Sequence, residues 1–313
     1  MVKRALLIGI NYLENNQYRL NGCINDVINV ESMLVDAFNY EMDNITVMRD
    51  DIYYANDQLF PNTTNILREL NKIFDESKEN DNIWLHFSGH GFFMKDDNND
   101  ESDNKDEMII TVNDFGRLEA ILDDQLNEIF SKNVSNTFSV FDCCNSGTIG
   151  DLEWSFKFEK IEKKEDNITI DIKESNEKNI IDEINKEDIK QEYKINKYQE
   201  NKNSKVKNMV MLSGARDDQF AYDTFNFKSQ IAMGALTTSL LYIIRKNKHN
   251  INSYKLQEEI CKDLLSKGFP DQTPCLSSSN EVINYTINKN QVTSLTKTKT
   301  STKKNTRKMY MFF

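Results

Sequence analysis

The chain has 313 residues, of which 38% are hydrophobic and 28% charged, and its formal net charge is −11. Its length and apolar share predict a globular protein, and its acidity argues against a general nucleic-acid binder, whose binding surface needs clustered Lys and Arg. No run of about eighteen apolar residues occurs, so we expect no membrane span. Charged residues and Asn come too early at the start for a secretory signal, so we expect no secretion either.

Cysteine usage indicates a reducing compartment. The chain has five cysteines, an odd number, and Cys143 and Cys144 are adjacent. Both features argue against a disulfide framework. We therefore expect free thiols and a cytoplasmic protein.

Short apolar runs alternate with helical patterns along the chain. The runs at 4–11, 45–48, 83–87, 138–141 and 209–212 are typical of strands buried on both faces of a parallel sheet. Apolar residues at a spacing of three and four predict helices over 24–38, 64–76, 125–130, 232–245 and 254–266, with Thr63 or Thr64 capping the second. The alternation predicts an α/β fold whose functional residues follow the strand ends.

Two charged segments interrupt this pattern. In 152–207 about half of the residues are Asp, Glu or Lys, which predicts a flexible insert. The segment 296–313 begins with a basic stretch without apolar residues, which predicts a disordered tail. We therefore predict one domain made from 1–151 and 208–295, interrupted by the insert 152–207 and followed by the tail.

Two predicted strand ends carry groups that suit nucleophilic catalysis. His90 follows the run 83–87, and Cys143 and Cys144 follow the run 138–141. A cysteine nucleophile reacts as its thiolate, and a neighbouring imidazole favours the thiolate by taking the proton, which it then gives to the leaving amine. The backbone N–H groups of Gly91 and Cys144 are candidate donors to an oxyanion.

Other interpretations remain open for the same residues. A buried cysteine is often an inert small hydrophobic residue. His86 and His90 together with Cys143 and Cys144 offer the ligand types of a zinc site. A dinucleotide site is disfavoured, because the sequence around Gly9 lacks the glycine spacing that such a site needs.

Several successive blocks resemble those of type I metacaspases, cysteine peptidases of the clan of caspases and legumains. The blocks are RALLIGINY with LNGCINDV, WLHFSGHG, FDCCNSG, MVMLSGARDDQ and GALTTSLL. They come in the family's order, and the resemblance covers 4–151 and 208–287. It implies a caspase-like three-layer sandwich with a mostly parallel central sheet, and a monomer. Matched by motif, His90 and Cys144 are the catalytic dyad, and Cys143 falls at a variable position.

The resemblance also implies an acidic specificity pocket that accepts Arg or Lys. Cys23, Asp26, Ser88 and Asp142 match its lining. Two carboxylates at strand ends would attract a guanidinium or ammonium group. Asp26 also suits the first turn of the helix 24–38, where an acid contributes about 0.3–1 kcal/mol through the helix dipole. The two roles are compatible.

Many members of the family need calcium, and four aspartates match the positions that bind it. They are Asp106, Asp123, Asp124 and Asp151. Calcium favours several carboxylate oxygens. The alternative is that Asp123 only caps the helix that begins near Gln125.

The resemblance implies a calcium-stimulated cysteine endopeptidase, without an organic cofactor, that cleaves proteins after Arg or Lys. It also suggests a zymogen that cleaves itself in the insert, for which Lys160, Lys163 and Lys164 are candidate positions. One departure is Asn145, where the family usually has His. Together with the basic tail, Asn145 motivates the alternative of a catalytically silent caspase-fold scaffold.

Overall fold

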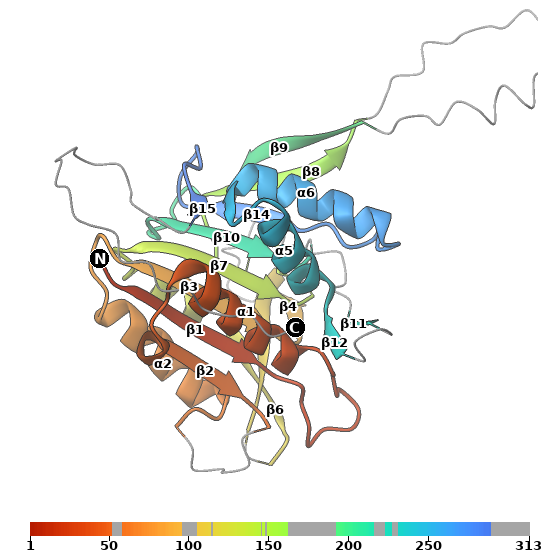
Figure 1. Ribbon diagram of the computed structural model, residues 1–313. Helices are drawn as coiled ribbons and strands as arrows, with labels where there is room; N and C mark the ends of the chain where they lie inside the picture. The colour runs from red at the N-terminus through yellow and green to blue at the C-terminus, as the bar shows by residue number, and fades with distance from the viewer. Residues whose placement is uncertain are drawn as a thin grey trace, which may run out of the picture.

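The computed structural model describes residues 1–51, 58–95, 105–113, 115–144, 146–147, 149–161, 192–215, 223–226 and 231–288, and within them eight strands form one central sheet (Figure 1). Five of these strands run parallel: β2 (Ile45–Arg49), β1 (Lys3–Gly9), β3 (Asn82–Ser88), β7 (Asn136–Asp142) and β10 (Met209–Ser213). The sheet continues antiparallel through β14 (Cys275–Ser278), β8 (Trp154–Lys160) and β9 (Tyr193–Gln199).

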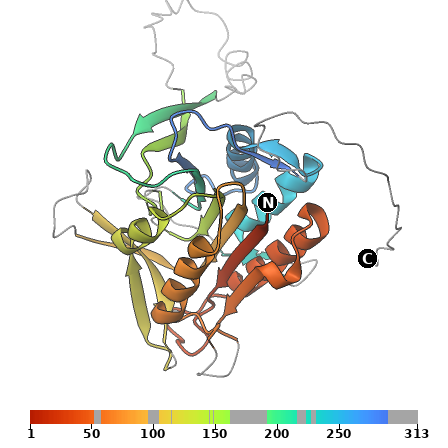
Figure 2. The ribbon, with the colours of Figure 1, turned by 90° about the vertical axis from the view of Figure 1, so that its left-hand side faces the viewer.

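Helices cover both faces of this sheet (Figure 2). One face packs against α1 (Cys23–Phe38), α5 (Ala235–Lys246) and α6 (Ser253–Ser266), and the other packs against α2 (Thr63–Asp75) and α3 (Asp123–Phe130). The strand β1 shows why both faces of the sheet are covered. Ala5 and Leu7 join the first core and Leu6 and Ile8 the second, because successive side chains of a strand point to opposite faces. The predicted three-layer α/β architecture with a mostly parallel sheet is confirmed.

Shorter elements surround the central sheet, and sequence analysis did not predict most of them. They are the 3-10 helix η1 (Met42–Asn44), the three-stranded sheet β4 (Gly91–Lys95), β5 (Lys105–Val112) and β6 (Leu118–Leu122), the pair β11 (Asp223–Asn226) and β12 (Ile231–Gly234), and the pair β13 (Asn250–Asn252) and β15 (Thr286–Asn288).

Two helix starts differ from the prediction. The residue that caps α2 is Asn62, whose side chain accepts a hydrogen bond from the Asn65 N–H at 2.8 Å, and not Thr63 or Thr64. The helix predicted from 232 begins only at Ala235, because 231–234 pairs with β11 as a strand and Gly234 caps the helix.

The prediction of a flexible insert over 152–207 is wrong at both of its ends. The strands β8 and β9 pair with each other there, and β8 also pairs with β14, so they form one edge of the central sheet at the top of Figure 1. Phe156 and Phe158 are buried in alternation with charged residues. Charges are tolerated because they face outward and pair, as Lys157 does with Glu200 at 3.0 Å. Residues 162–191 and the predicted tail 296–313 lie outside the described residues.

A search of the helices in the described ranges finds none with the length and apolar character that crossing a membrane requires.

Candidate active site

The predicted catalytic loops follow two neighbouring strands. Ser88 at the end of β3 is paired in register with Asp142 at the end of β7, and the Gly89 N–H donates to the Asp142 carbonyl at 3.3 Å. His90 and Cys144 each come two residues later. The loops touch at Gly91, where a Cβ atom would lie 2.1 Å from the Cys144 carbonyl oxygen. The structure therefore brings the two predicted loops together and explains why position 91 is glycine.

The two adjacent cysteines differ in their surroundings. Cys143 is 1% exposed and belongs to the core beside α2 and α3, whereas Cys144 is partly exposed. Burial raises the pKa of the Cys143 thiol well above its usual value. Cys143 is therefore held as an unreactive thiol, and Cys144 is the accessible one. All five cysteines lie within the described residues, and none of them forms a disulfide, in agreement with the prediction.

The His90 imidazole is oriented by a backbone carbonyl. Its Nε2 lies 2.8 Å from the carbonyl oxygen of Tyr18. Because a carbonyl can only accept, Nε2 carries the proton in this contact, which assigns the tautomer from geometry. In the neutral imidazole Nδ1 then holds the lone pair that acts as a base.

Tyr12 supports the His90 loop through its hydroxyl group and its ring. The hydroxyl of Tyr12 accepts a hydrogen bond from the His90 N–H at 2.7 Å and donates to the Ile110 carbonyl at 2.7 Å. The two rings also pack with their centroids 4.7 Å apart. Tyr12 is fully buried and has a left-handed backbone with φ of 54°. This strained position is stabilised by neighbouring contacts.

Asp50 supplies those contacts from the end of β2. Its two carboxylate oxygens accept from the Asn11 N–H at 2.8 Å and the Leu13 N–H at 2.9 Å, on either side of Tyr12. Sequence analysis missed both Tyr12 and Asp50. The rule that functional groups follow the strand ends would have pointed to them, since Asp50 comes directly after β2 and Tyr12 lies three residues after the end of β1.

Three of the four residues predicted to line the specificity pocket meet at the start of α5. The Ser88 hydroxyl donates to Asp26, and the Gly234 N–H donates to the same carboxylate at 2.9 Å. A Cβ atom on Gly234 would lie 2.2 Å from Asp142 Oδ2 and 2.9 Å from Asp26 Oδ2, so the two carboxylates flank this glycine. Asp26 is 0% and Asp142 5% exposed.

The fourth predicted pocket residue, Cys23, is buried at the start of α1, and its carbonyl packs against Gly9. Asp26 does lie in the first turn of this helix. Its carboxylate also accepts hydrogen bonds from Ser88 and Gly234, so Asp26 contacts residues outside its own helix, one of which is predicted to line the same pocket. Gly234 itself was not predicted, because no local pattern indicates that α5 begins beside β3 and β7.

The predicted calcium ligands lie near α3. Asp123 is buried, and its carboxylate accepts from the Glu107 N–H at 2.6 Å and the Asp124 N–H at 2.8 Å. Burial, and then the negative charges of Asp151 and Asp124, raise the pKa of Asp123 to about 7. Carboxylates have the donor chemistry that calcium prefers. In the described ranges, however, no three His, Cys, Asp or Glu side chains are arranged to hold a metal ion.

The positions of His86 and Cys143 disfavour the interpretation as a zinc site. His86 faces Thr237 at the start of α5, with 3.3 Å between Nε2 and Oγ1. Cys143 instead belongs to the core on the opposite side of the sheet. Two of the four proposed zinc ligands therefore point away from each other.

Three of the singled-out residues, Asn145, Lys163 and Lys164, lie outside the described residues. Lys160 is exposed but ends β8, where it pairs with Tyr193. The prediction that Lys160 belongs to a flexible segment is therefore wrong.

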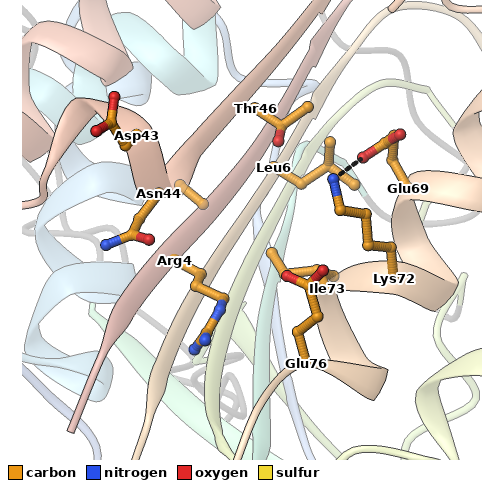
Figure 3. A pocket seen from close by; sticks show the side chains of 10 residues that line it. Arg4, Leu6, Asp43, Asn44, Thr46, Glu69, Lys72, Ile73 and Glu76 are labelled. Carbon is orange, nitrogen blue, oxygen red and sulfur yellow. Dashed lines mark ion pairs between the residues drawn. The ribbon is translucent and has the colours of Figure 1, made fainter. Parts of the chain in front are cut away.

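A surface pocket lies away from this site, between β1, β2, η1 and α2 (Figure 3). Charged side chains from its wall are paired: Lys72 lies 3.6 Å from Glu69, and Arg4 donates to Asp81 at 2.8 Å. Arg4 stands near the start of β1, whereas the catalytic loops follow the strand ends. The pocket is thus separate from the candidate active site.

Comparisons with known proteins agree with this arrangement. A protein-family model for the metacaspase, peptidase C14 domain matches residues 3–153. The chain is 32% identical to Metacaspase-1A of Aspergillus oryzae, covering 89% of this chain and 68% of that protein. It is also 32% identical to Metacaspase-1 of Emericella nidulans, covering 89% and 70%. A crystal structure of a protein from Geobacter sulfurreducens shares the fold, with a TM-score of 0.55 at 17% identity over 92% of this chain and 94% of that one. The chain belongs to the metacaspase family of cysteine-type endopeptidases.

Proposed function

We propose that this protein hydrolyses peptide bonds after Arg or Lys, with Cys144 as the nucleophile and His90 as the general acid and base. The observation that carries the proposal is the contact between the two loops. Gly91 lies against the Cys144 backbone, and the Nε2–H group of His90 donates a hydrogen bond to the Tyr18 carbonyl. This leaves Nδ1 of His90 as the basic nitrogen of the dyad.

The reaction follows from these groups. Nδ1 of His90 takes the Cys144 thiol proton, and the thiolate attacks the substrate carbonyl carbon. The N–H groups of Gly91 and Cys144 are the proposed donors to the oxyanion that forms. His90 then returns the proton to the leaving amine, and an acyl-enzyme remains. Water, deprotonated by His90, hydrolyses the thioester and frees the thiol.

The proposed preference for Arg or Lys rests on Asp26 and Asp142. Both carboxylates are buried and flank Gly234, and their donors come from Ser88, Gly234 and Thr237. Donors of this kind favour the ionised form of a carboxylate. A substrate guanidinium or ammonium group could pair with these carboxylates and a neutral side chain could not, which gives selectivity for a cation.

We further propose that calcium stimulates the activity and that Asp106, Asp123, Asp124 and Asp151 supply its ligands. Burial, and then the negative charges of Asp151 and Asp124, raise the pKa of Asp123, and a bound cation would compensate these negative charges. Since the described arrangement brings no three of these groups together, binding requires them to move.

Self-cleavage is proposed in the part of the insert between β8 and β9. These strands remain paired with each other and with β14, so a cut between them would leave the two pieces of the chain in one sheet. We also expect a cytoplasmic monomer. Free thiols suit a reducing compartment, and the Lys side chains of the edge strand β9 oppose sheet extension.

The test is a peptide-library cleavage profile of the purified protein with and without calcium. The proposal predicts cleavage after Arg and Lys that increases when calcium is added. Cleavage after acidic or apolar residues would contradict the pocket, and equal rates with calcium and with a chelator would contradict the metal site alone. Self-cleavage by the Cys144 site is contradicted if a purified Cys144→Ala variant is still shortened to the same products as the wild type.

A further inference from the structure

A buried chain of hydrogen bonds runs from β3 through α5 to Asp142. The N–H and hydroxyl groups of Thr237 both donate to Asp142 Oδ2, at 2.9 Å and 2.7 Å. Behind Thr237, Nε2 of His86 lies 3.3 Å from the same hydroxyl. Thr237 is 0% and His86 1% exposed, so water does not compete with these bonds.

The chemistry of the three groups sets the direction of the chain. A hydroxyl has one proton, and Thr237 gives it to the carboxylate, which can only accept. The Thr237 oxygen must then accept from His86, so Nε2 of His86 carries the proton. Burial lowers the pKa of His86 to about 3, which keeps the ring neutral. Both protons of the chain therefore point toward Asp142.

His86 lowers the stability of the fold in one respect in which an apolar side chain at this position would not. Its Nδ1 atom is buried and has no hydrogen-bond partner among the residues that the structure describes. An unsatisfied buried polar atom is destabilising, and an apolar side chain of similar size would remove the cost. What an apolar side chain cannot supply is the Nε2–H donor to Thr237.

The same turn of α5 contacts both acids of the proposed pocket. Gly234, which caps the helix, donates its N–H to Asp26, and Thr237 in the first turn donates to Asp142. The two carboxylates themselves come from α1 and β7, which lie before the insert, whereas α5 lies after it. The start of α5 thus joins the acids contributed by two separate segments.

We propose that Thr237 is a positioning residue for the specificity pocket and that His86 supports it by fixing the direction of its hydroxyl. Thr237 holds the Asp142 carboxylate in one orientation, toward a substrate guanidinium or ammonium. The inference rests on the proposed function, because it assigns Asp142 to the binding of the cation.

The test compares steady-state kinetics on an Arg peptide for variants of Thr237. Thr237→Val keeps the shape and the N–H but removes the hydroxyl, and we expect KM to rise about tenfold with kcat little changed. Thr237→Ser restores the hydroxyl and the wild-type KM. The matched control is Thr238→Val, since the hydroxyl of Thr238 on the same helix has no hydrogen-bond partner in the described part of the chain.

The role of His86 is tested by a double-mutant cycle. His86→Leu raises KM in the same direction, and in combination with Thr237→Val it adds less than it does alone, because both changes break one chain. The rate at which iodoacetamide inactivates Cys144 stays at the wild-type value in Thr237→Val, which shows that the dyad is intact.

Two results would overturn the inference while the proposed function stands: a wild-type KM in Thr237→Val, or a loss of kcat that Thr237→Ser does not reverse. A wild-type protein that does not select Arg or Lys would instead contradict the proposed function, and the inference with it. That result is visible before any variant is measured.

Discussion

At the scale of single residues, the adjacent thiols of Cys143 and Cys144 differ clearly in their surroundings. Burial raises the pKa of Cys143, while Cys144 is partly exposed beside the His90 loop. We predict that limited treatment with iodoacetamide at neutral pH modifies Cys144 first and abolishes peptidase activity. Peptide mapping by mass spectrometry measures the site. Modification of Cys143 ahead of Cys144 would contradict the assignment of the nucleophile.

His86 predicts a pH dependence of stability. Its pKa is about 3 in the folded chain, against 6.5 for an ordinary histidine. Between these values the unfolded chain binds a proton that the folded chain does not, so acid favours unfolding. We expect the wild type to lose about 2 kcal/mol more than His86→Gln in free energy of unfolding on going from about pH 7 to about pH 5.

Urea titrations of both proteins at the two pH values measure this difference. The carboxylates and the other histidines are common to both proteins, so their contributions cancel. Equal losses in the two proteins would show that His86 does not stay neutral in the folded state.

At this scale the sequence was informative about where the proposed dyad lies and incomplete about its support. The meeting of the His90 and Cys144 loops could be predicted because each follows a recognisable strand, and the ends of parallel strands meet at one edge. Thr237 and Gly234 could not, since their contacts with Asp142 and Asp26 depend on where α5 packs. That placement is a tertiary property without a local pattern.

Among the elements, the loop between β1 and α1 determines the position of His90. Tyr12 lies in it and links the His90 N–H to the Ile110 carbonyl. We predict that Tyr12→Phe loses about 1–3 kcal/mol of stability, because two backbone groups lose their partner. We also expect kcat to fall, since His90 is less firmly held. Denaturant titration and peptide kinetics measure the two effects.

Tyr18→Phe is the matched control for this prediction. Tyr18 contacts His90 through its backbone carbonyl and its ring, both of which Phe keeps, and its hydroxyl bonds only to Gln17 among the residues that the structure describes. The substitution should leave both kcat and stability close to wild type. An equal loss in the two variants would contradict a specific role for the Tyr12 hydroxyl.

The strands themselves were predicted to different degrees. Four of the five parallel strands are buried along most of their length, as their apolar runs predict, whereas β2 lies at the edge of the sheet and buries only Met48. β8 and β9 were missed because the charge of 152–207, taken over the whole segment, conceals the alternation of Phe156 and Phe158 with polar residues. Strand periodicity has to be examined over windows as short as one strand.

At the scale of the whole molecule, the site depends on both parts of the chain. The proposed dyad and the two acids come from residues before the insert, whereas the start of α5 comes after it. The parallel pairing of β7 with β10 joins these parts in the sheet centre, and β14 joins the second part to β8, which belongs to the insert.

The most direct test of this account is the hydrolysis of a short fluorogenic peptide with Arg before the scissile bond. The wild type should cleave it, and Cys144→Ala and His90→Ala should each lose nearly all activity while remaining folded by circular dichroism. Absence of cleavage by the wild type, with calcium present, or retention of activity in either variant would contradict the central claim that Cys144 and His90 form a working dyad.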